Sequence, residues 1–403
     1  MSELWLKNAL EANTFLNTLF DNLNSGIFIV DQEARVSQVN RVFEKIFARS
    51  EEEVEGQLCG NAIGCIFPTL AGKDCGTLDE CKTCRIRGAI VKALTEKVST
   101  DGELISRSFI ILGKAVPKHL LFSVRYITYN GKDMVVIIVD DVTEKETRRR
   151  LLEKRQRMLE RDLEAAAGIQ HSLLPRENPE QRHFSFAWRY EPCDSVGGDI
   201  FNLVPLDDDR IIVYMVDVSG HGVPAALVTV SITQFIQHYV SRQRGEFSPR
   251  HLLRQLDREY PYERFNAYFT MVCMLLDGRK RSLVYANAGH PVPVKLGNDG
   301  DLRQLEEGAA PVGMSLLPFT EERIVFEPGD MLFCHTDGVS EFRNPEGENF
   351  GCQRLYQIIG QAAEASPQEV VDKVCRELAA FGREQAADDD ITILAFKMRS
   401  DEA

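Results

Sequence analysis

The sequence lacks two features that would place it at once in a familiar class: a long hydrophobic run and an excess of positive charge. We also expect no secretory leader, because Met1–Trp5 soon gives way to polar residues. Apolar runs such as Met134 to Val139 are far too short to cross a bilayer, so we expect no membrane span. The net charge of −14 argues against nucleic acid as a partner. With 44% hydrophobic and 27% charged residues, the composition is that of a soluble globular protein, and 403 residues suffice for two domains. We expect a cytoplasmic location.

Structural disulfides are not expected either, because cysteines in the cytoplasm are usually reduced thiols or metal ligands. Five of the ten cysteines lie within residues 59–84, namely Cys59, Cys65, Cys75, Cys81 and Cys84. Four thiolates can close a zinc site or hold an iron–sulfur cluster; the candidate ligands are Cys65, Cys75, Cys81 and Cys84, with Cys59 as the spare. Their irregular spacing fits neither framework cleanly, and the C-x-x-C pair at 81–84 is also typical of a thiol switch. Zinc, an iron–sulfur cluster, a reversible disulfide and an insertion with no ligand all stay open.

Aspartates at the ends of hydrophobic strands are unusually frequent in the second half of the sequence. The four sites are Asp199 after Gly197-Gly198, Asp217 at the end of the apolar run 211–216, Asp337 after the run 331–334, and the triplet 388–390 before the run 391–396. A single carboxylate of this kind is usually a turn residue. Four in one segment predict a site for a hard cation, because Mg²⁺ and Mn²⁺ prefer oxygen ligands. Two such ions can hold and activate a water for attack on a phosphoryl group.

The motifs around these aspartates resemble, in the same order, the metal-binding motifs of PPM-type serine/threonine phosphatases, and the bacterial branch that contains RsbU and SpoIIE matches best. The matching segments are Gly197-Gly198-Asp199, Asp217-Val218-Ser219-Gly220-His221-Gly222, Thr336-Asp337-Gly338-Val339 and Asp389-Asp390-Ile391-Thr392. Three further segments, 287–291, 311–314 and 327–330, also resemble that branch. The similarity spans about residues 165–398.

This resemblance implies a β-sandwich flanked by helices over residues 176–403, with two Mn²⁺ or Mg²⁺ ions bound. Asp217 would bridge the two ions and the backbone carbonyl of Val218 would add a ligand. Asp199, Asp337 and Asp389 would complete the set. Such a site needs no side-chain nucleophile, because the cations neutralise phosphate charge and a water attacks phosphorus in line.

Three polar residues near these motifs have less specific roles. His221 either touches a water or substrate near the site or packs the turn, and both interpretations stay open. Asn287 and His290 are expected to stabilise a turn rather than to take part in catalysis.

The first part of the chain, residues 1–143, resembles a PAS sensor domain. A strand, a turn, a second strand and a short helix over 25–47 resemble the start of that fold. Strands are expected near 104–112 and 119–129, and a closing strand at 134–139 precedes Asp141-Val142-Thr143-Glu144. Such an ending is common where PAS domains pass into a signalling helix. The cysteine-rich segment 59–84 is then an insertion, expected as a loop or short helices.

Residues 144–175 are predicted to form a helical coiled-coil linker. Leu152, Leu159, Ala166 and Leu173 recur at heptad spacing, and Pro175 would stop the helix. The heptad pattern favours a parallel homodimer over the alternative of one amphipathic helix packed on its own catalytic domain. The expected fold class is therefore α+β, with a PAS-like sensor, this linker and a PPM-type β-sandwich flanked by helices.

Together these features predict a metal-dependent protein serine/threonine phosphatase regulated by its PAS-like domain. The resemblance implies a phosphorylated STAS-domain anti-sigma factor antagonist as the substrate, in a partner-switching pathway. From the charge and the short apolar runs we expect neither nucleic acid nor membrane as a partner. The alternative is a redox or metal sensor whose C-terminal domain is a non-catalytic binding module. Metal-dependent hydrolysis would distinguish the two.

Overall fold

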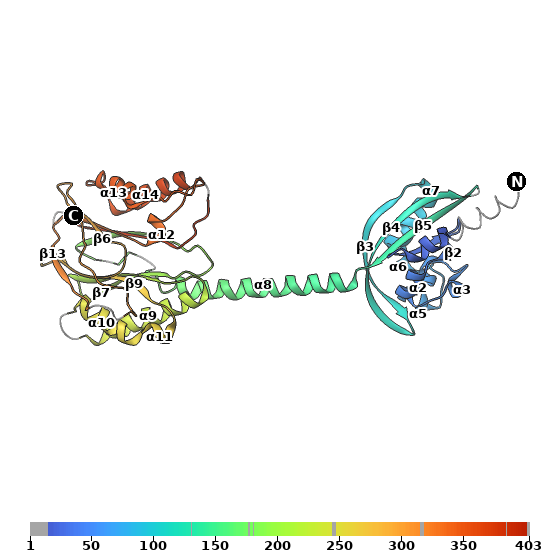
Figure 1. Cartoon of the computed structure of the whole chain (residues 1–403), viewed down its shortest axis with the longest axis horizontal. Helices are drawn as coiled ribbons and strands as arrows, with labels where there is room; N and C mark the ends of the chain where they lie inside the picture. The colour runs from blue at the N-terminus through green and yellow to red at the C-terminus, as the bar shows by residue number, and fades with distance from the viewer. Residues whose placement is uncertain are drawn as a thin grey trace. The chain divides into compact units, whose positions relative to one another are not determined.

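The chain forms two compact units, Met1–Arg157 and Met158–Ala403, and the division between them falls within helix α8 (Thr143–His171). The computed structural model describes residues 15–129, 131–175, 178–179, 181–243, 247–314, 318–383 and 385–400 (Figure 1). Each unit buries its own hydrophobic residues. Within the described residues, no helix is both long and apolar enough to span a bilayer.

The N-terminal unit is built on a five-stranded antiparallel sheet with the strand order β2-β1-β5-β4-β3. Its strands are β1 (Gly26–Val30), β2 (Val36–Val39), β3 (Thr100–Ile111), β4 (Lys114–Tyr129) and β5 (Lys132–Asp141). The helices between β2 and β3 are α2 (Arg41–Phe47), α3 (Glu51–Val54), α4 (Cys59–Ala62), α5 (Ile66–Ala71), α6 (Asp79–Lys82) and α7 (Arg85–Glu96). Alternating residues of the sheet, such as Phe122, Val124 and Val139, pack against these helices in one core. The expected beginning and end of a PAS-like domain are both present.

The cysteine-rich segment consists of short helices, one of the two forms expected. Cys59 begins α4, Cys65 and Cys84 lie at the N-caps of α5 and α7, and Cys81 lies in α6. The segment is part of the core rather than a surface loop, because Cys59, Cys65 and Cys75 belong to the buried cluster.

The C-terminal unit contains two five-stranded sheets that pack against each other. The first has the order β13-β10-β9-β8-β7 and the second β12-β11-β14-β15-β6. The strands are β6 (Phe184–Glu191), β7 (Asp199–Pro205), β8 (Arg210–Val218), β9 (Phe269–Asp277), β10 (Ser282–Ala288), β11 (Val294–Leu296), β12 (Leu302–Gln304), β13 (Glu322–Val325), β14 (Met331–His335) and β15 (Ile391–Met398). Apolar side chains from both inner faces fill the space between the sheets, which is the packing of a β-sandwich.

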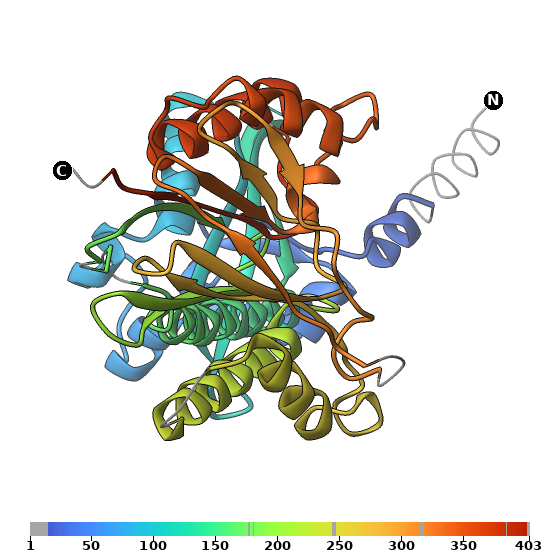
Figure 2. The same ribbon diagram turned by 90° about the vertical axis from the view of Figure 1, so that its left-hand side faces the viewer.

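Helices cover both outer faces of this sandwich (Figure 2). Helices α9 (Val223–Arg242) and α10 (Pro249–Glu259) pack on the first sheet, and the short α11 (Tyr262–Phe265) follows them. Helices α13 (Cys352–Gly360) and α14 (Pro367–Gly382) pack on the second sheet, whereas α12 (Asp337–Ser340) directly follows β14. Because central strands are buried on both faces, β8 and β15 are almost continuously apolar. The β-sandwich flanked by helices is the fold that the resemblance implied, so the expected α+β class with a PAS-like unit and a PPM-type sandwich is confirmed; the coiled coil stays a prediction.

The linker differs from its expectation at its C-terminal end. Helix α8 ends at His171, before Pro175 is reached, and Leu173 packs against the core of the C-terminal unit. Leu173 is therefore not a fourth member of the heptad series on the helix. Leu152 and Leu159 do lie on α8, and both side chains are exposed.

Candidate metal centre

Two pairs of strand ends bring the predicted aspartates to one end of the sandwich. Asp199 begins β7 and lies directly opposite Asp217 at the end of β8. Asp337 follows β14, and Asp389 precedes the neighbouring antiparallel strand β15. The two sheets meet at this end, because the hydroxyl of Thr392 in β15 donates a 2.6 Å hydrogen bond to Oδ2 of Asp199.

The four carboxylates repel one another. Burial, followed by the negative charges of Asp337 and Asp389, raises the pKa of Asp217 to about 7. Burial and then the charge of Asp217 raise the pKa of Asp199. Burial and then the charge of Asp389 raise the pKa of Asp337. Asp199 is the most deeply buried of the four, and Asp389 is exposed.

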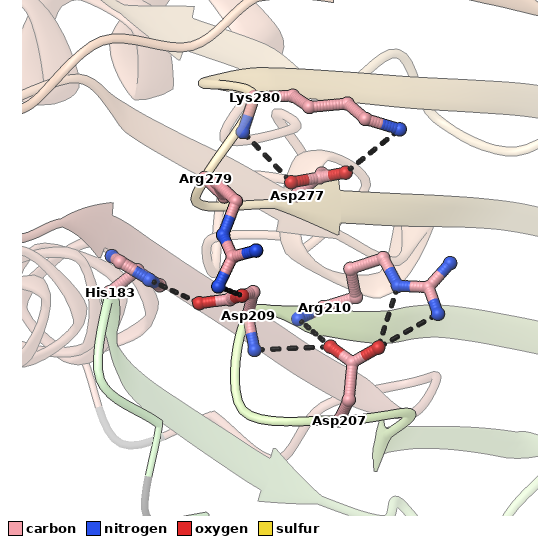
Figure 3. A network of polar contacts seen from close by, with 7 residues as sticks. All are labelled: His183, Asp207, Asp209, Arg210, Asp277, Arg279 and Lys280. Carbon is pink, nitrogen blue, oxygen red and sulfur yellow. Dashed lines mark hydrogen bonds and ion pairs between the residues drawn. The ribbon is translucent and has the colours of Figure 1, made fainter.

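Carboxylates at the other end of the same strands are neutralised by basic side chains (Figure 3). In the β7–β8 turn, Asp207 pairs with Arg210 at 2.7 Å, and Asp209 contacts Arg279 at 2.8 Å and His183 at 2.9 Å. At the end of β9, Asp277 contacts Lys280 at 3.6 Å. At this end of the sheet, all three aspartates therefore have a basic partner.

No ion pair joins Asp199, Asp217, Asp337 or Asp389 to a basic side chain in the described part of the chain. Across those same residues, no group of three or more His, Cys, Asp or Glu side chains is already arranged to hold a metal ion. The chemistry of these four aspartates nevertheless fits a divalent cation. Their carboxylates offer oxygen ligands, are partly buried and repel one another, and a bound divalent cation would neutralise that negative charge.

The backbone around Val218 is packed closely against Gly198. A Cβ atom on Gly198 would lie 2.8 Å from the carbonyl oxygen of Val218, so only glycine fits there. The N–H of Val218 donates a 3.2 Å hydrogen bond to the carbonyl of Gly198. These contacts fix the position of the Val218 carbonyl, which is the predicted backbone ligand beside Asp217.

Asp390 is a positioning residue that the sequence analysis did not single out. Its carboxylate is buried and accepts hydrogen bonds from the backbone N–H groups of Cys193 (2.9 Å), Gly198 (2.6 Å) and Asp199 (3.2 Å). Its side chain also fills the space where a Cβ on Gly197 would lie. Asp390 thus joins the segment just before β15 to the loop that leads to Asp199.

Two threonines extend this connection. Thr392 N–H donates to the hydroxyl of Thr336 at 3.1 Å, and that hydroxyl donates to the carbonyl of Asp390 at 3.3 Å. Since Thr392 also donates to Asp199, the segments before Asp337 and after Asp389 are tied to the first sheet. Both threonines belong to the quoted motifs, which is the one signal that could have identified them.

The end of α8 reaches the same loop. Gln170 is buried; its Nε2 donates to the carbonyl of Gly197 at 2.7 Å and to the hydroxyl of Thr229 in α9 at 3.1 Å. Its Oε1 accepts from the N–H of Gly197 at 3.1 Å. One side chain therefore connects the linker helix, the loop before Asp199 and helix α9. No sequence pattern pointed to it.

His221, Asn287 and His290 are the three polar residues near the motifs whose roles the sequence left less defined. His221 is exposed, with its ring nitrogen 3.6 Å from the carboxylate of Asp194. The side-chain amide of Asn287 donates to the carbonyl of His290 at 2.9 Å and accepts from its N–H at 2.8 Å, as expected for a residue that stabilises a turn. Burial lowers the pKa of His290 to about 3, so its ring is neutral.

The predicted cysteine site lies in the other unit. Cys65, Cys75, Cys81 and Cys84 line one small cavity, and Cys59 lines it with them. All five are free thiols.

Family models match two parts of the chain. The model described as "Stage II sporulation protein E (SpoIIE)" matches residues 207–399, and the model described as "PAS fold" matches residues 14–63. Both matches agree with the resemblances seen in the sequence.

Curated relatives are similar over part of the chain. Protein IcfG of Synechocystis is 26% identical over 262 residues, which is 58% of this chain and 41% of that protein. The phosphoserine phosphatase RsbP of Bacillus subtilis is 28% identical over 189 residues, which is 45% of each protein. The match thus spans less than half the length of these two relatives.

A solved structure has the same fold as the C-terminal unit. The SiaA-PP2C domain of Pseudomonas aeruginosa aligns with a TM-score of 0.53 and 24% sequence identity, covering 60% of this chain and 98% of that domain. This likeness supports the fold.

Proposed function

Because the chain combines a PAS domain with a phosphatase domain of the SpoIIE family, we propose that it is a cytoplasmic, metal-dependent protein serine/threonine phosphatase regulated by its N-terminal unit. One observation carries this proposal. Four carboxylates from two sheets gather at one end of the sandwich without a basic partner among the described residues, whereas the carboxylates at the other end are paired. A site of this kind is completed by cations.

Asp199, Asp217, Asp337 and Asp389, with the carbonyl of Val218, would hold two Mn²⁺ or Mg²⁺ ions. The chemistry supplied by these ions, when bound, is activation of the attacking water and neutralisation of phosphate charge. The protein's own residues orient the ligands. Thr392 fixes one oxygen of Asp199, and Asp390 fixes the backbone between Cys193 and Asp199. The exposed Asp389 and the half-buried Asp217 leave the site open to a phosphorylated side chain.

The proposed substrate is a phosphorylated STAS-domain anti-sigma factor antagonist, in a partner-switching pathway. The similarity to RsbP, a protein named as a phosphoserine phosphatase, supports phosphoserine as the group attacked. The resemblance of the metal-binding motifs to the RsbU-like branch supports the choice of protein.

Helix α8 would transmit the regulation of the phosphatase activity, because it contacts both units. At its beginning, Asp141 accepts a 3.0 Å hydrogen bond from the N–H of Thr143, whose hydroxyl accepts from the N–H of His119 in β4 at 2.9 Å. At its end, Gln170 binds Gly197 and Thr229. We infer that the PAS domain rotates or shifts α8 in a homodimer, and that this movement repositions α9 and α10 beside the metal site.

The test is hydrolysis of an aryl phosphate with Mn²⁺, comparing the wild type with Asp217→Asn and with Asp277→Asn as a matched control. Asp277 is a buried strand-end aspartate in the same sheet, but it pairs with Lys280. We expect turnover to fall to background in Asp217→Asn and to persist in Asp277→Asn. Equal turnover in all three proteins would exclude the proposed site.

The alternative function, a sensor with a non-catalytic C-terminal module, makes a different prediction. In that case no protein would hydrolyse the aryl phosphate or a phosphorylated STAS protein, although Mn²⁺ binding measured by calorimetry could still depend on Asp217.

A further inference from the structure

The N-terminal unit concentrates thiols and positive charge around one cavity. Its lining includes the five cysteines of the insertion together with Arg87 and Arg107. Cys59, Cys65, Cys75 and Cys81 are each at most 7% exposed. The cavity has a volume of about 20 Å³, which is room for one water-sized molecule. An iron–sulfur cluster does not fit this space as it stands.

Both arginines direct their guanidinium groups at sulfur. Nη1 of Arg107 lies 3.5 Å from Sγ of Cys84 and 3.6 Å from Sγ of Cys65. Nη1 of Arg87 lies 4.0 Å from Sγ of Cys75 and donates to the carbonyl of Cys75 at 3.1 Å. In the described residues neither arginine forms an ion pair with a carboxylate. Partly buried guanidinium groups favour negative charge nearby, and here the ionisable groups beside them are thiols.

Cys59 and Cys75 line the same cavity, and the sulfur of Cys75 lies against Gly60, the residue that follows Cys59. Cys75 is held in place by Asn61, whose Oδ1 accepts from the N–H of Cys75 at 2.8 Å and whose Nδ2 donates to the carbonyl of Lys73 at 3.1 Å. The sulfur of Cys75 lies where a Cβ on Gly60 would be, so the residue after Cys59 must be glycine for this contact to form. The segment 73–75 is therefore fixed against the start of α4.

We propose that Cys59 and Cys75 are a peroxide-sensitive thiol pair, in which Cys75 is the attacking thiolate and Cys59 the resolving thiol. The pair differs from the set expected from sequence, in which Cys59 was the spare. The proposal concerns the N-terminal unit alone and does not depend on the phosphatase activity.

The ionisation of the two thiols agrees with these roles. The hydrogen bond from Cys59 is the largest cause that lowers the pKa of Cys75, to about 6; burial opposes it, and Gly60 N–H and Arg87 contribute further. The same hydrogen bond and burial raise the pKa of Cys59. Cys59 thus keeps its proton while Cys75 carries the negative charge.

The chemistry balances with hydrogen peroxide as the oxidant. The Cys75 thiolate attacks one peroxide oxygen, the O–O bond breaks, and the departing hydroxide takes a proton from solvent to become water. Cys75 is then a sulfenic acid. The Cys59 sulfur attacks the Cys75 sulfur, the S–O bond breaks, and the hydroxide leaves as water with the Cys59 proton. Two thiols lose two electrons, and one peroxide becomes two waters.

The experiment uses the full chain, purified without oxygen, reduced, freed of reductant and treated with equimolar hydrogen peroxide. Thiols are counted after denaturation, and disulfides are mapped by mass spectrometry without reduction. We expect the count to fall from ten to eight, with a Cys59–Cys75 disulfide. An unchanged count, or a disulfide between other cysteines, would overturn the proposal.

Variants separate the roles of the thiols. Cys75→Ser should keep all its thiols after treatment, and Cys59→Ser should stop at a sulfenic acid that dimedone traps. Cys81→Ser is the matched control, because Cys81 lines the same cavity but is not a member of the proposed pair, and this variant should still lose two thiols. Arg87→Gln should slow the loss roughly tenfold at pH 5, because below the pKa of Cys75 (about 6) a rise of one pKa unit removes about nine-tenths of the thiolate. An unchanged rate in Arg87→Gln would contradict the role of the guanidinium.

The same untreated preparation is analysed for zinc, iron and sulfide. We expect none in stoichiometric amount. One zinc ion or one iron–sulfur cluster per chain, lost in Cys75→Ser, would overturn the thiol pair in favour of a metal site.

Discussion

Asp390 shows how a residue without a chemical role of its own can decide the geometry of a site. It accepts three backbone hydrogen bonds from residues 193–199, so it holds the loop from which Asp199 projects. We predict that Asp390→Asn lowers Mn²⁺ affinity or turnover about ten- to a hundredfold, the usual effect of losing a residue that orients metal ligands. The measurement is a Mn²⁺ titration of aryl phosphate hydrolysis.

The control is Asp388→Asn, which removes the same charge from an exposed neighbour. If both variants lose activity equally, the loss reflects the summed negative charge of the triplet rather than the contacts of Asp390.

The triplet also shows what sequence can and cannot determine at this scale. The order of the motifs identified Asp199, Asp217, Asp337 and Asp389, and the structure brings them to one end of the sandwich. The alternation of side chains along an extended segment implies that Asp390 faces away from Asp389. It does not reveal that residues 193–199, far away in the sequence, supply the N–H groups that Asp390 binds.

At the scale of elements, α8 and the loop before Asp199 are joined by Gln170. Its replacement by alanine leaves the buried N–H and C=O of Gly197 without their side-chain partner, at a cost of about 1–3 kcal/mol in the free energy of unfolding of the C-terminal unit. We predict that Gln170→Ala also weakens Mn²⁺-dependent turnover, because the backbone next to Asp199 loses a support. Denaturant unfolding and a Mn²⁺ titration measure the two effects.

Glu164→Ala, on an exposed position of the same helix, is the matched control and should change neither quantity. If Gln170→Ala lowers stability while the folded protein keeps its Mn²⁺ dependence, Gln170 is structural and does not transmit movement of α8 to the site.

Hydrophobic runs predicted the strands of the N-terminal unit and the strands β8, β14 and β15 of the C-terminal unit, because these runs are strongly apolar. The heptad pattern failed at the end of α8. Leu173 fits the heptad spacing, but it packs on the core of the C-terminal unit after the helix has ended. Heptad spacing shows that apolar residues recur at a regular interval. It does not show which surface of the protein buries each of them. The short strands β11, β12 and β13 were missed because each is only three or four residues long.

At the scale of the whole molecule, the prediction concerns association of two chains through α8. The Leu152 and Leu159 side chains are 56% and 64% exposed, and Leu151 and Met158 beside them are exposed as well. Leucines at heptad spacing that meet a second helix are buried in a coiled-coil seam, and a charged residue there opposes association. We predict that the wild type sediments as a dimer, with twice the 45.5 kDa mass of one chain, and that Leu152→Glu with Leu159→Glu is monomeric.

Lys154→Glu is the matched control. It changes the net charge of the chain by the same amount as the two leucine substitutions, but Lys154 lies on the same exposed helix outside the leucine series. A monomeric Lys154→Glu protein would mean that net charge alone controls association. A wild type that stays monomeric at high concentration would contradict the coiled coil, and regulation would then have to act within one chain, through the contact of Gln170 with Gly197 and Thr229.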